Sequence, residues 1–408
     1  MNNNDPLENY RRRKRMREES SINNRKVGNI SDSLSKVIDN EILSDDYMKN
    51  KGKNLKKPIK SKNKKRKKKR SIFFKAFLIF ITIIVIFLVG VGIYLWTLMN
   101  RINSTNFEDT PIMEGQISEE ELERMRQTFG DNIKWDITNQ KKSNKNIINI
   151  LLVGEEAIEK WGHGRGRSDS MMIATVNSRE NTIKLTSLMR DVYVRIPGYL
   201  DNKLNAAYNM GGIPLLKQTI ETNYDIVIDY SAVVQFSGFE KIIDQIGGVE
   251  ISLTADEAQY LNTTNYISKK KYRNVVEGKQ ILNGNQALGF ARIRYRASSN
   301  GEANDFGRTN RQRMLIQAVV NKLKSKNLLE LTDVVNGVLS NVLTDLPKSE
   351  IVNIIKVYTL MKDKNLETFR VPIDNSYEDI RIRGMSVLVI DFAENKRALH
   401  KFIFGTED

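Results

Sequence analysis

Cysteine is absent from the 408 residues, and histidine occurs only at His163 and His400. Without cysteine the chain can form no disulfide, no thiolate metal site and no cysteine nucleophile. Two histidines so far apart also argue against a histidine-rich zinc site or a histidine relay. The composition therefore points away from sulfur chemistry and from clustered imidazoles.

Positive charge is unevenly distributed along the chain. Residues 1–75 carry 24 Lys/Arg and 9 Asp/Glu, whereas the remaining residues carry 41 and 40. The formal net charge of +16 thus belongs almost entirely to the N-terminal part, and the rest is close to neutral. A positively charged site further along must be local, and the charge alone does not predict a nucleic-acid binder.

One long uncharged segment, residues 76–99, predicts a membrane span. At about 1.5 Å per residue its 24 residues reach roughly 36 Å, enough for a hydrocarbon core of about 30 Å. Tyr94 and Trp96 lie near its end, where aromatic rings favour the interface. Residues 60–70, with nine basic side chains, precede it and should stay in the cytoplasm. A basic run beside a membrane span is explained by topology and anionic lipids, so we expect no nucleic-acid partner.

These observations predict five regions. We expect a disordered basic cytoplasmic tail at 1–71, a transmembrane helix at 72–99, an extracellular stalk at 100–145, a folded core at 146–326 and a C-terminal extension packed on it at 327–408. A cleaved signal peptide is disfavoured because the apolar run is too long and begins too late.

The hydrophobic patterns outside the membrane alternate between strands and helices. Strands are expected at 146–154, 171–177, 182–189, 226–234 and 369–373. Helices are expected from Ser118, at 214–222, at 307–327 and at 387–404. Residues 236–253 and 282–296 are each expected to begin as a helix and to end as a strand. Alternation of this kind predicts an α/β sandwich around one sheet.

Six arginines occur within residues 290–313. If Arg292, Arg294 and Arg296 are on a strand, they share one face. Arg308, Arg311 and Gln312 are spaced i, i+3, i+4 near a helix N-terminus, where backbone N–H groups favour an anion. The pattern predicts a phosphate-type anion site; the alternative is a solvated surface whose charges are balanced by acidic neighbours such as Glu302 and Asp305.

A second group of charged residues precedes the first. Glu156 follows the first predicted strand, and Arg190 and Asp191 end another, where open α/β sheets commonly bind ligands. The remaining members are Arg167, Asp169 and Lys203. Carboxylates beside arginines are commonly structural ion pairs, but near a diphosphate they could instead hold Mg²⁺.

Seven stretches within residues 146–326 resemble the LytR-CpsA-Psr family of bacterial cell-wall proteins. In order they are NILLVG, RSDSMMIATVN, SLMRDVYVRIPG, KLNAAYNMGG, FSGFEKIIDQIGGVEI, LNGNQALGFARIR and DFGRTNRQR. The basic tail, the single span and the external domain are similar to the family's usual plan.

The resemblance implies a three-layer α/β/α sandwich with a central mixed sheet and an apolar tunnel for a polyprenyl tail. It implies a Mg²⁺- or Mn²⁺-dependent phosphotransferase in the membrane of a Gram-positive type bacterium, with its catalytic domain outside. Such an enzyme moves an anionic glycopolymer, for example wall teichoic acid or capsule, from undecaprenyl diphosphate to the muramic acid 6-hydroxyl of peptidoglycan. The alternatives are a polyprenyl-diphosphate hydrolase and a membrane-bound sensor of lipid-linked precursors.

The resemblance and the charge pattern together give the candidate site. The expected diphosphate ligands are Arg167, Arg190, Lys203, Arg292, Arg294, Arg308, Arg311 and Gln312. The expected catalytic residues are Arg190, Arg308, Asp169 and Asp191, with either aspartate as the possible base. The expected metal ligands are Asp169 and Glu156, although the family usually has aspartate at the position of Glu156.

Overall fold

The computed structural model describes residues 105–107, 116–129, 133–138, 140–156, 167–324, 326, 328–363 and 365–405. These residues all belong to one compact unit of the chain, Ile83–Asp408. The predicted tail and the predicted membrane span lie outside the described residues. Among the described helices, none is both long enough and apolar enough to cross a bilayer.

Helices and strands alternate irregularly along the described part of the chain. The helices are α3 (Glu119–Phe129), α4 (Leu204–Tyr224), α5 (Phe236–Gln245), α6 (Ala255–Thr263), η2 (Lys270–Tyr272), α7 (Gly284–Arg292), α8 (Asn304–Leu323), α9 (Leu328–Leu339), α10 (Lys348–Leu360) and α11 (Phe392–Phe404). The strands are β1 (Ile147–Glu156), β2 (Arg167–Asn177), β3 (Thr182–Leu188), β4 (Tyr193–Val194), β5 (Asn202–Lys203), β6 (Tyr230–Gln235), β7 (Val249–Leu253), β8 (Gly278–Leu282), β9 (Val342–Thr344), β10 (Glu367–Val371), β11 (Tyr377–Ile382) and β12 (Met385–Ile390).

A six-stranded mixed sheet forms the centre of the domain, in the order β10-β3-β2-β1-β6-β9. Strand β1 runs antiparallel to β2 and parallel to β6, while β10 runs parallel to β3. The apolar sequence of β1 suits this central position because both of its faces are covered. The prediction of an α/β fold around a central mixed sheet is therefore confirmed.

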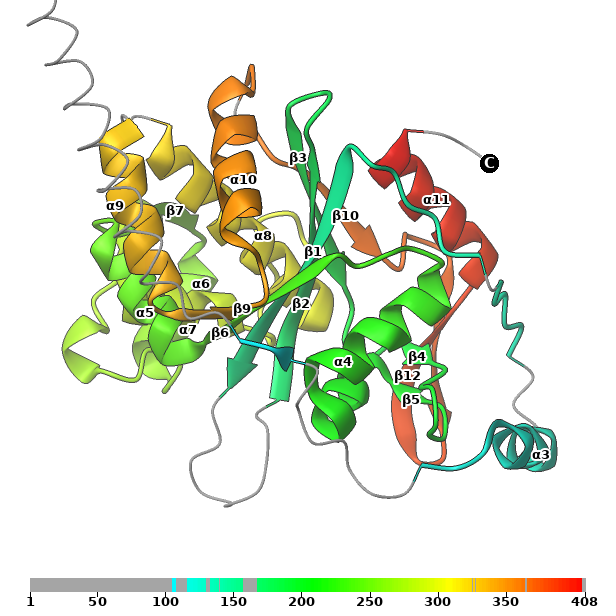
Figure 1. The fold of residues 1–408 in the computed structure, drawn as a ribbon. Coiled ribbons are helices and arrows are strands. Elements are labelled where there is room, and N and C mark those ends of the chain that lie inside the picture. Colours follow the sequence, from blue (N-terminus) through cyan, green and yellow to red (C-terminus); the bar gives the residue numbers. More distant parts are fainter. Residues whose placement is uncertain are drawn as a thin grey trace, which may run out of the picture. The chain divides into compact units, whose positions relative to one another are not determined.

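Helices cover both faces of the sheet. Figure 1 shows α4 and α11 on one side and α10 on the other. On the first side Leu151 and Ile173 pack with apolar residues of α4 and α11. On the second side Ile150 and Val176 pack against Val357 of α10. Helices α5 to α8 and the β7–β8 hairpin share a further apolar cluster at one end of the sheet.

The C-terminal region completes the sheet. β9 pairs with β6 at one edge, and β10 pairs with β3 at the other. The predicted strand at 369–373 corresponds to β10. The predicted helix at 387–404 was wrong in its first part, because Val387 to Ile390 pair with β11 and the helix begins only at Phe392. Four apolar residues in a row suit a strand as well as a helix.

The predicted strand across Arg292, Arg294 and Arg296 was also wrong. An Asn283–Gln286 capping box starts α7, which continues to Arg292. The chain then follows an irregular path, and the carbonyls of Ile293 and Arg296 accept hydrogen bonds from the Arg311 side chain. Backbone groups that are bonded to a side chain are not available to a neighbouring strand.

Two other boundaries differ from the predictions. The helix expected at 214–222 begins at Leu204, and Gly212, with φ of 64°, produces a kink just before Pro214. The strand expected at 226–234 is regular only from Tyr230 onward. Before it, Ile226 forms a single bridge with Lys142 and is fully buried.

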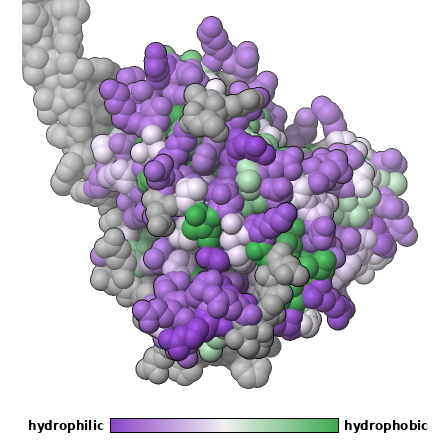
Figure 2. Space-filling model, turned by 90° about the vertical axis from the view of Figure 1, so that its right-hand side faces the viewer, coloured by the Kyte–Doolittle hydropathy of each residue, from purple (hydrophilic) through white to green (hydrophobic). Residues whose placement is uncertain are grey.

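The described part of the predicted stalk packs on the domain. α3 is present as predicted, its Leu122 is fully buried, and Arg126 forms an ion pair of 2.8 Å with Asp201. Trp135 lies 5.3 Å from Phe392 between ring centroids. On the face shown in Figure 2, hydrophilic residues predominate and apolar residues gather only in small areas. Such a distribution is typical of a surface in contact with water.

We expect a fragment of residues 146–326 not to fold cooperatively, because it lacks both edge strands of the central sheet and the covering helices α10 and α11. Thermal unfolding followed by circular dichroism should give no sigmoidal transition for this fragment. A fragment of residues 105–405 serves as the control and should unfold in one cooperative step. A sharp transition in the shorter fragment would contradict the expectation.

Candidate active site

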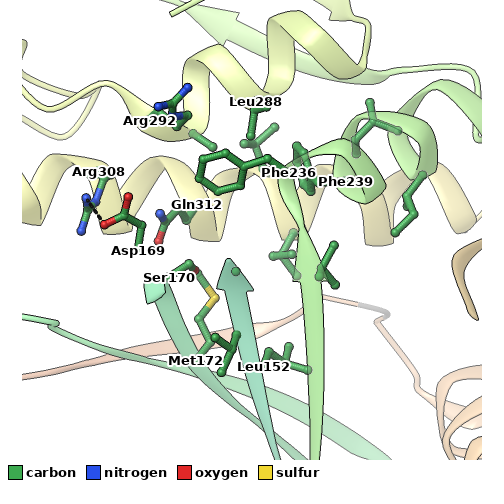
Figure 3. Close-up of a pocket in the computed structure, with 18 of the residues that line it drawn as sticks. Leu152, Asp169, Ser170, Met172, Phe236, Phe239, Leu288, Arg292, Arg308 and Gln312 are labelled. Carbon is green, nitrogen blue, oxygen red and sulfur yellow. Dashed lines mark ion pairs between the residues drawn. The ribbon is translucent and has the colours of Figure 1, made fainter. Parts of the chain in front are cut away.

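A cavity of about 620 Å³ lies between one end of the central sheet and the helices α5, α7 and α8. Figure 3 shows that side chains from strands β1 and β2 face it from one side, and Phe236 and Leu288 from another. Gly154, Asp169 and Ser170 line the cavity near the end of the β1–β2 ladder, where the register shifts after the Gly154–Ser170 pair and Asp169 has no partner residue on β1.

Three charged side chains form the centre of the polar part of the cavity wall. Nη1 of Arg190 lies 2.6 Å from Oδ1 of Asp169, and Nη1 of Arg308 lies 3.6 Å from the same oxygen. Asp169 comes from β2, Arg190 from the chain after β3, and Arg308 from the second turn of α8. Three segments that are distant in sequence therefore bring their charges together.

The buried carboxylate of Asp305 forms ion pairs with three arginines. Its Oδ1 lies 2.7 Å from Nη2 of Arg308, 3.6 Å from Nε of Arg190 and 3.5 Å from Nε of Arg294. Burial raises the pKa of Asp305, although the pull of Arg308 and Arg190 acts in the opposite direction. Together with Asp169 and Asp191, Asp305 balances much of the positive charge of Arg190, Arg294 and Arg308.

The electrostatics of the two central arginines differ. Burial lowers the pKa of Arg308, with Asp305 acting against that effect. Burial also acts to lower the pKa of Arg190, but the carboxylates of Asp305, Asp191 and Asp169 together raise it. Both guanidinium groups stay charged, because arginine does not lose its proton in proteins.

Several buried N–H groups here lack a hydrogen-bond partner among the described residues. They are the Nε groups of Arg190, Arg294 and Arg308, whereas Nη2 of Arg308 forms the 2.7 Å ion pair with Asp305. Buried donors without an acceptor are costly, by about 1–3 kcal/mol each. An anionic ligand that accepts these bonds would relieve that cost, and a phosphate group matches the forked geometry of arginine.

The remainder of the cavity is apolar. Along α8 one side of the helix carries Arg308 and Gln312 and then Leu315, Ile316 and Val319, so the wall changes from polar to apolar along a single helix. The opposite wall contains Phe236, Phe239, Ile242, Ile243, Leu288, Val338 and Val342. The cavity thus joins an anion-binding end to an apolar interior.

Lys203 and Asp191 form an ion pair and do not line the cavity. Nζ of Lys203 lies 2.9 Å from Oδ1 of Asp191, and Oδ2 of Asp191 lies 3.6 Å from Nε of Arg190. They contact the site only through Arg190. Of the two aspartates predicted as the base, Asp169 is the one on the wall.

Glu156 and Arg292 form their own pair. Oε1 of Glu156 accepts a hydrogen bond of 2.8 Å from Nη2 of Arg292, which also lies on the cavity wall. No group of three acidic, histidine or cysteine side chains that could hold a metal occurs among the residues that the structure describes. Mg²⁺ commonly uses one or two protein carboxylates together with substrate phosphates, and Asp169 on the wall fits that mode.

Arg311 is a correction to the predicted set of diphosphate ligands. It lies about 100° around the helix from Gln312 and is fully buried. Its Nε lies 2.7 Å from Oε1 of Glu257, itself 1% exposed in its side chain. Because its guanidinium also binds two backbone carbonyls, Arg311 supports the loop that carries Arg294 and does not reach the cavity.

Two parts of the site have no clear signal in the sequence. Asp305 is predicted only as a countercharge, yet it contacts three arginines. The residues of the apolar wall are not predicted, although the i, i+3, i+4 series that begins at Gln312 is a signal for them. The side chain of Arg167 lies outside the described residues; its backbone begins β2 opposite Glu156.

Known proteins with this arrangement were found by sequence and by structure. The "Regulatory protein MsrR" of Staphylococcus aureus is 34% identical over 264 residues, which cover 64% of this chain and 75% of that protein. The "Polyisoprenyl-teichoic acid--peptidoglycan teichoic acid transferase TagU" of Bacillus cereus is 29% identical over 293 residues, covering 71% and 84%. The crystal structure of TagV of Bacillus subtilis superposes with a TM-score of 0.51 and 25% identity, covering 64% of this chain and 98% of that chain.

A sequence model of one family extends over most of the folded domain. It matches residues 113–401, a wider range than the motifs at 146–326 and one that includes both edge strands of the sheet. The match agrees with the resemblance predicted from the motifs. The chain therefore belongs to the LytR_cpsA_psr family.

Proposed function

We propose that this protein transfers an anionic glycopolymer from a polyprenyl-diphosphate carrier to a hydroxyl group of peptidoglycan. The observation that carries the proposal is the cavity, in which an arginine cluster adjoins an apolar interior. A lipid diphosphate has the same two parts. The name of the relative TagU of B. cereus, a teichoic acid transferase, supports the same reaction.

In this proposal the arginines bind the diphosphate and the apolar interior holds part of the polyprenyl tail. The hydroxyl oxygen of the acceptor, taken as the muramic acid 6-hydroxyl, attacks the phosphorus that bears the polymer. The bond from that phosphorus to the bridging oxygen breaks, and polyprenyl phosphate leaves. A phosphodiester joins polymer and peptidoglycan.

Stabilisation of negative charge is the main requirement of such a reaction. Arg190, Arg294 and Arg308 have N–H groups available for the oxygens of the diphosphate. The acceptor proton passes to a carboxylate, and the position of Asp169 on the cavity wall favours it over Asp191. Arg292 is available as a further ligand when its guanidinium turns from Glu156 to the substrate.

We propose Mg²⁺ as the cofactor, with Asp169 and Glu156 as its protein ligands and diphosphate oxygens completing the coordination. Bound Mg²⁺ would offset part of the charge on the departing phosphate. We also propose that the segment at residues 76–99 anchors the enzyme in the membrane. The catalytic domain then stays outside the cell, near a lipid substrate that cannot leave the bilayer.

Arg190→Ala should lower the rate of polymer transfer about 100-fold, because it removes a charged donor to the reacting phosphates. The assay is transfer from a defined lipid-diphosphate donor to peptidoglycan, with products identified by mass spectrometry. Arg179→Ala, in the exposed turn after β2, is the matched control and should retain full activity. Free phosphorylated polymer in place of the peptidoglycan adduct would instead indicate a hydrolase.

Asp169→Asn should raise the Mg²⁺ concentration needed for half-maximal transfer about tenfold, because it weakens one ligand of the metal. It should also lower the rate at saturating Mg²⁺, because an amide cannot take the acceptor proton. Mg²⁺ titration after removal of metal by a chelator measures this directly. Glu156→Gln is the comparison, and a similar shift in this variant identifies the second ligand. Full activity of the wild-type enzyme in excess chelator would refute the metal dependence.

A further inference from the structure

A strongly basic segment lies immediately beside the mouth of the cavity. Residues 269–279 carry five basic side chains and one acidic one, whereas the chain beyond residue 75 is almost neutral as a whole. The segment contains the short helix η2 and leads into β8. Local charge of this size on a near-neutral domain points to a specific anionic ligand.

Hydrogen bonds join this segment to the cavity wall. Nη2 of Arg273 donates to Oδ1 of Asn265 over 2.8 Å, and its Nε donates to the carbonyl of Ile267 over 2.8 Å. Asn265 and Tyr266 both line the cavity. The basic segment therefore begins three residues after Tyr266, whose ring lies near Arg292.

The five basic side chains differ in whether a carboxylate already pairs with them. Nζ of Lys269 lies 3.2 Å from Glu240, and Nζ of Lys279 lies 3.3 Å from Glu250. Lys270 and Lys271 are exposed, and neither has a carboxylate within ion-pair distance in the described part of the chain. The ammonium group of Lys271 lies 4.9 Å above the ring of Tyr272, which keeps it at the surface near Arg273.

Two tyrosine rings lie beside Arg292 and Arg296 on this side of the cavity. Tyr260 and Tyr266 lie 5.2 Å apart between centroids. The guanidinium of Arg296 lies 4.9 Å from the Tyr260 ring, and that of Arg292 lies 6.0 Å from the Tyr266 ring. Ring faces bind the C–H faces of sugars, while guanidinium and ammonium groups bind phosphates or carboxylates.

We propose that this surface, formed by residues 260–273 and Arg296, binds the anionic polymer of the donor as it leaves the cavity mouth. The inference rests on the proposed function and adds recognition of the polymer itself to recognition of the diphosphate. Sugar rings lie against Tyr260 and Tyr266, and the negative groups of the following repeats lie near Lys270, Lys271 and Arg273. The surface thus selects a charged polymer over a neutral one.

Binding of a polyanion to exposed lysines depends on the salt concentration. Lys270 and Lys271 are exposed, so salt screens their attraction for a polyanion over a distance of about 8 Å at physiological ionic strength. Buried groups such as Arg308 are screened much less. Salt should therefore weaken binding of the polymer more than binding of the diphosphate.

The test compares the Lys270→Gln/Lys271→Gln double variant with the wild type, using the full chain. One donor is a lipid diphosphate that carries an anionic polymer, and the other carries a neutral glycan of equal length. We expect the KM for the anionic donor to rise about fivefold with kcat unchanged, and the KM for the neutral donor to stay the same. Added salt should raise the KM for the anionic donor less in the variant than in the wild type.

Lys356→Gln/Lys362→Gln is the matched control, because it removes the same charge from exposed positions at and beyond the end of α10. It should behave as the wild type does. An equal change of KM for both donors, or no change for either, overturns the inference. A loss of binding to anionic lipid vesicles with no change in donor preference also overturns it and assigns the surface to the membrane. Wild-type protein that transfers neither donor contradicts the proposed function instead.

Discussion

The site depends on the balance between guanidinium groups and carboxylates at one end of the central sheet. Asp305 is 9% exposed in its side chain and lies between Arg190, Arg294 and Arg308. Removal of one partner from such a group leaves a buried charge without compensation, which is costly. The carboxylates thus keep the arginines together.

The buried ion pair between Arg311 and Glu257 supports the loop that carries one arginine of this cluster. Arg311 and Glu257 are almost inaccessible to water, and Glu257 also closes the capping box of α6. Through the carbonyls of Ile293 and Arg296, Arg311 fixes the irregular chain that presents Arg294. The helix α8 therefore lines the cavity with one side and positions a loop with the neighbouring side.

The sequence predicted which residues gather at the cavity better than it predicted their local structure. Local patterns identified Asp169, Arg190, Arg308 and Gln312, which all line the cavity, because their segments carry recognisable spacing and resemblance. They could not identify the direction of Arg311, because that depends on Glu257, which lies 54 residues away. The strand and helix assignments failed at Arg292–Arg296 and at Val387 for a related reason. Short apolar or alternating runs fit either structure, and long-range partners decide between them.

The two edges of the sheet have a consequence for the order of assembly. β9 and β10 are synthesised after every residue of the arginine cluster, and the sheet cannot be complete until Val371 has left the ribosome. Domains form as units, with their N-terminal parts emerging first. The pocket therefore matures late in the life of the nascent polypeptide, and a translation product that stops short of the last edge strand carries the reactive side chains without the framework that aligns them.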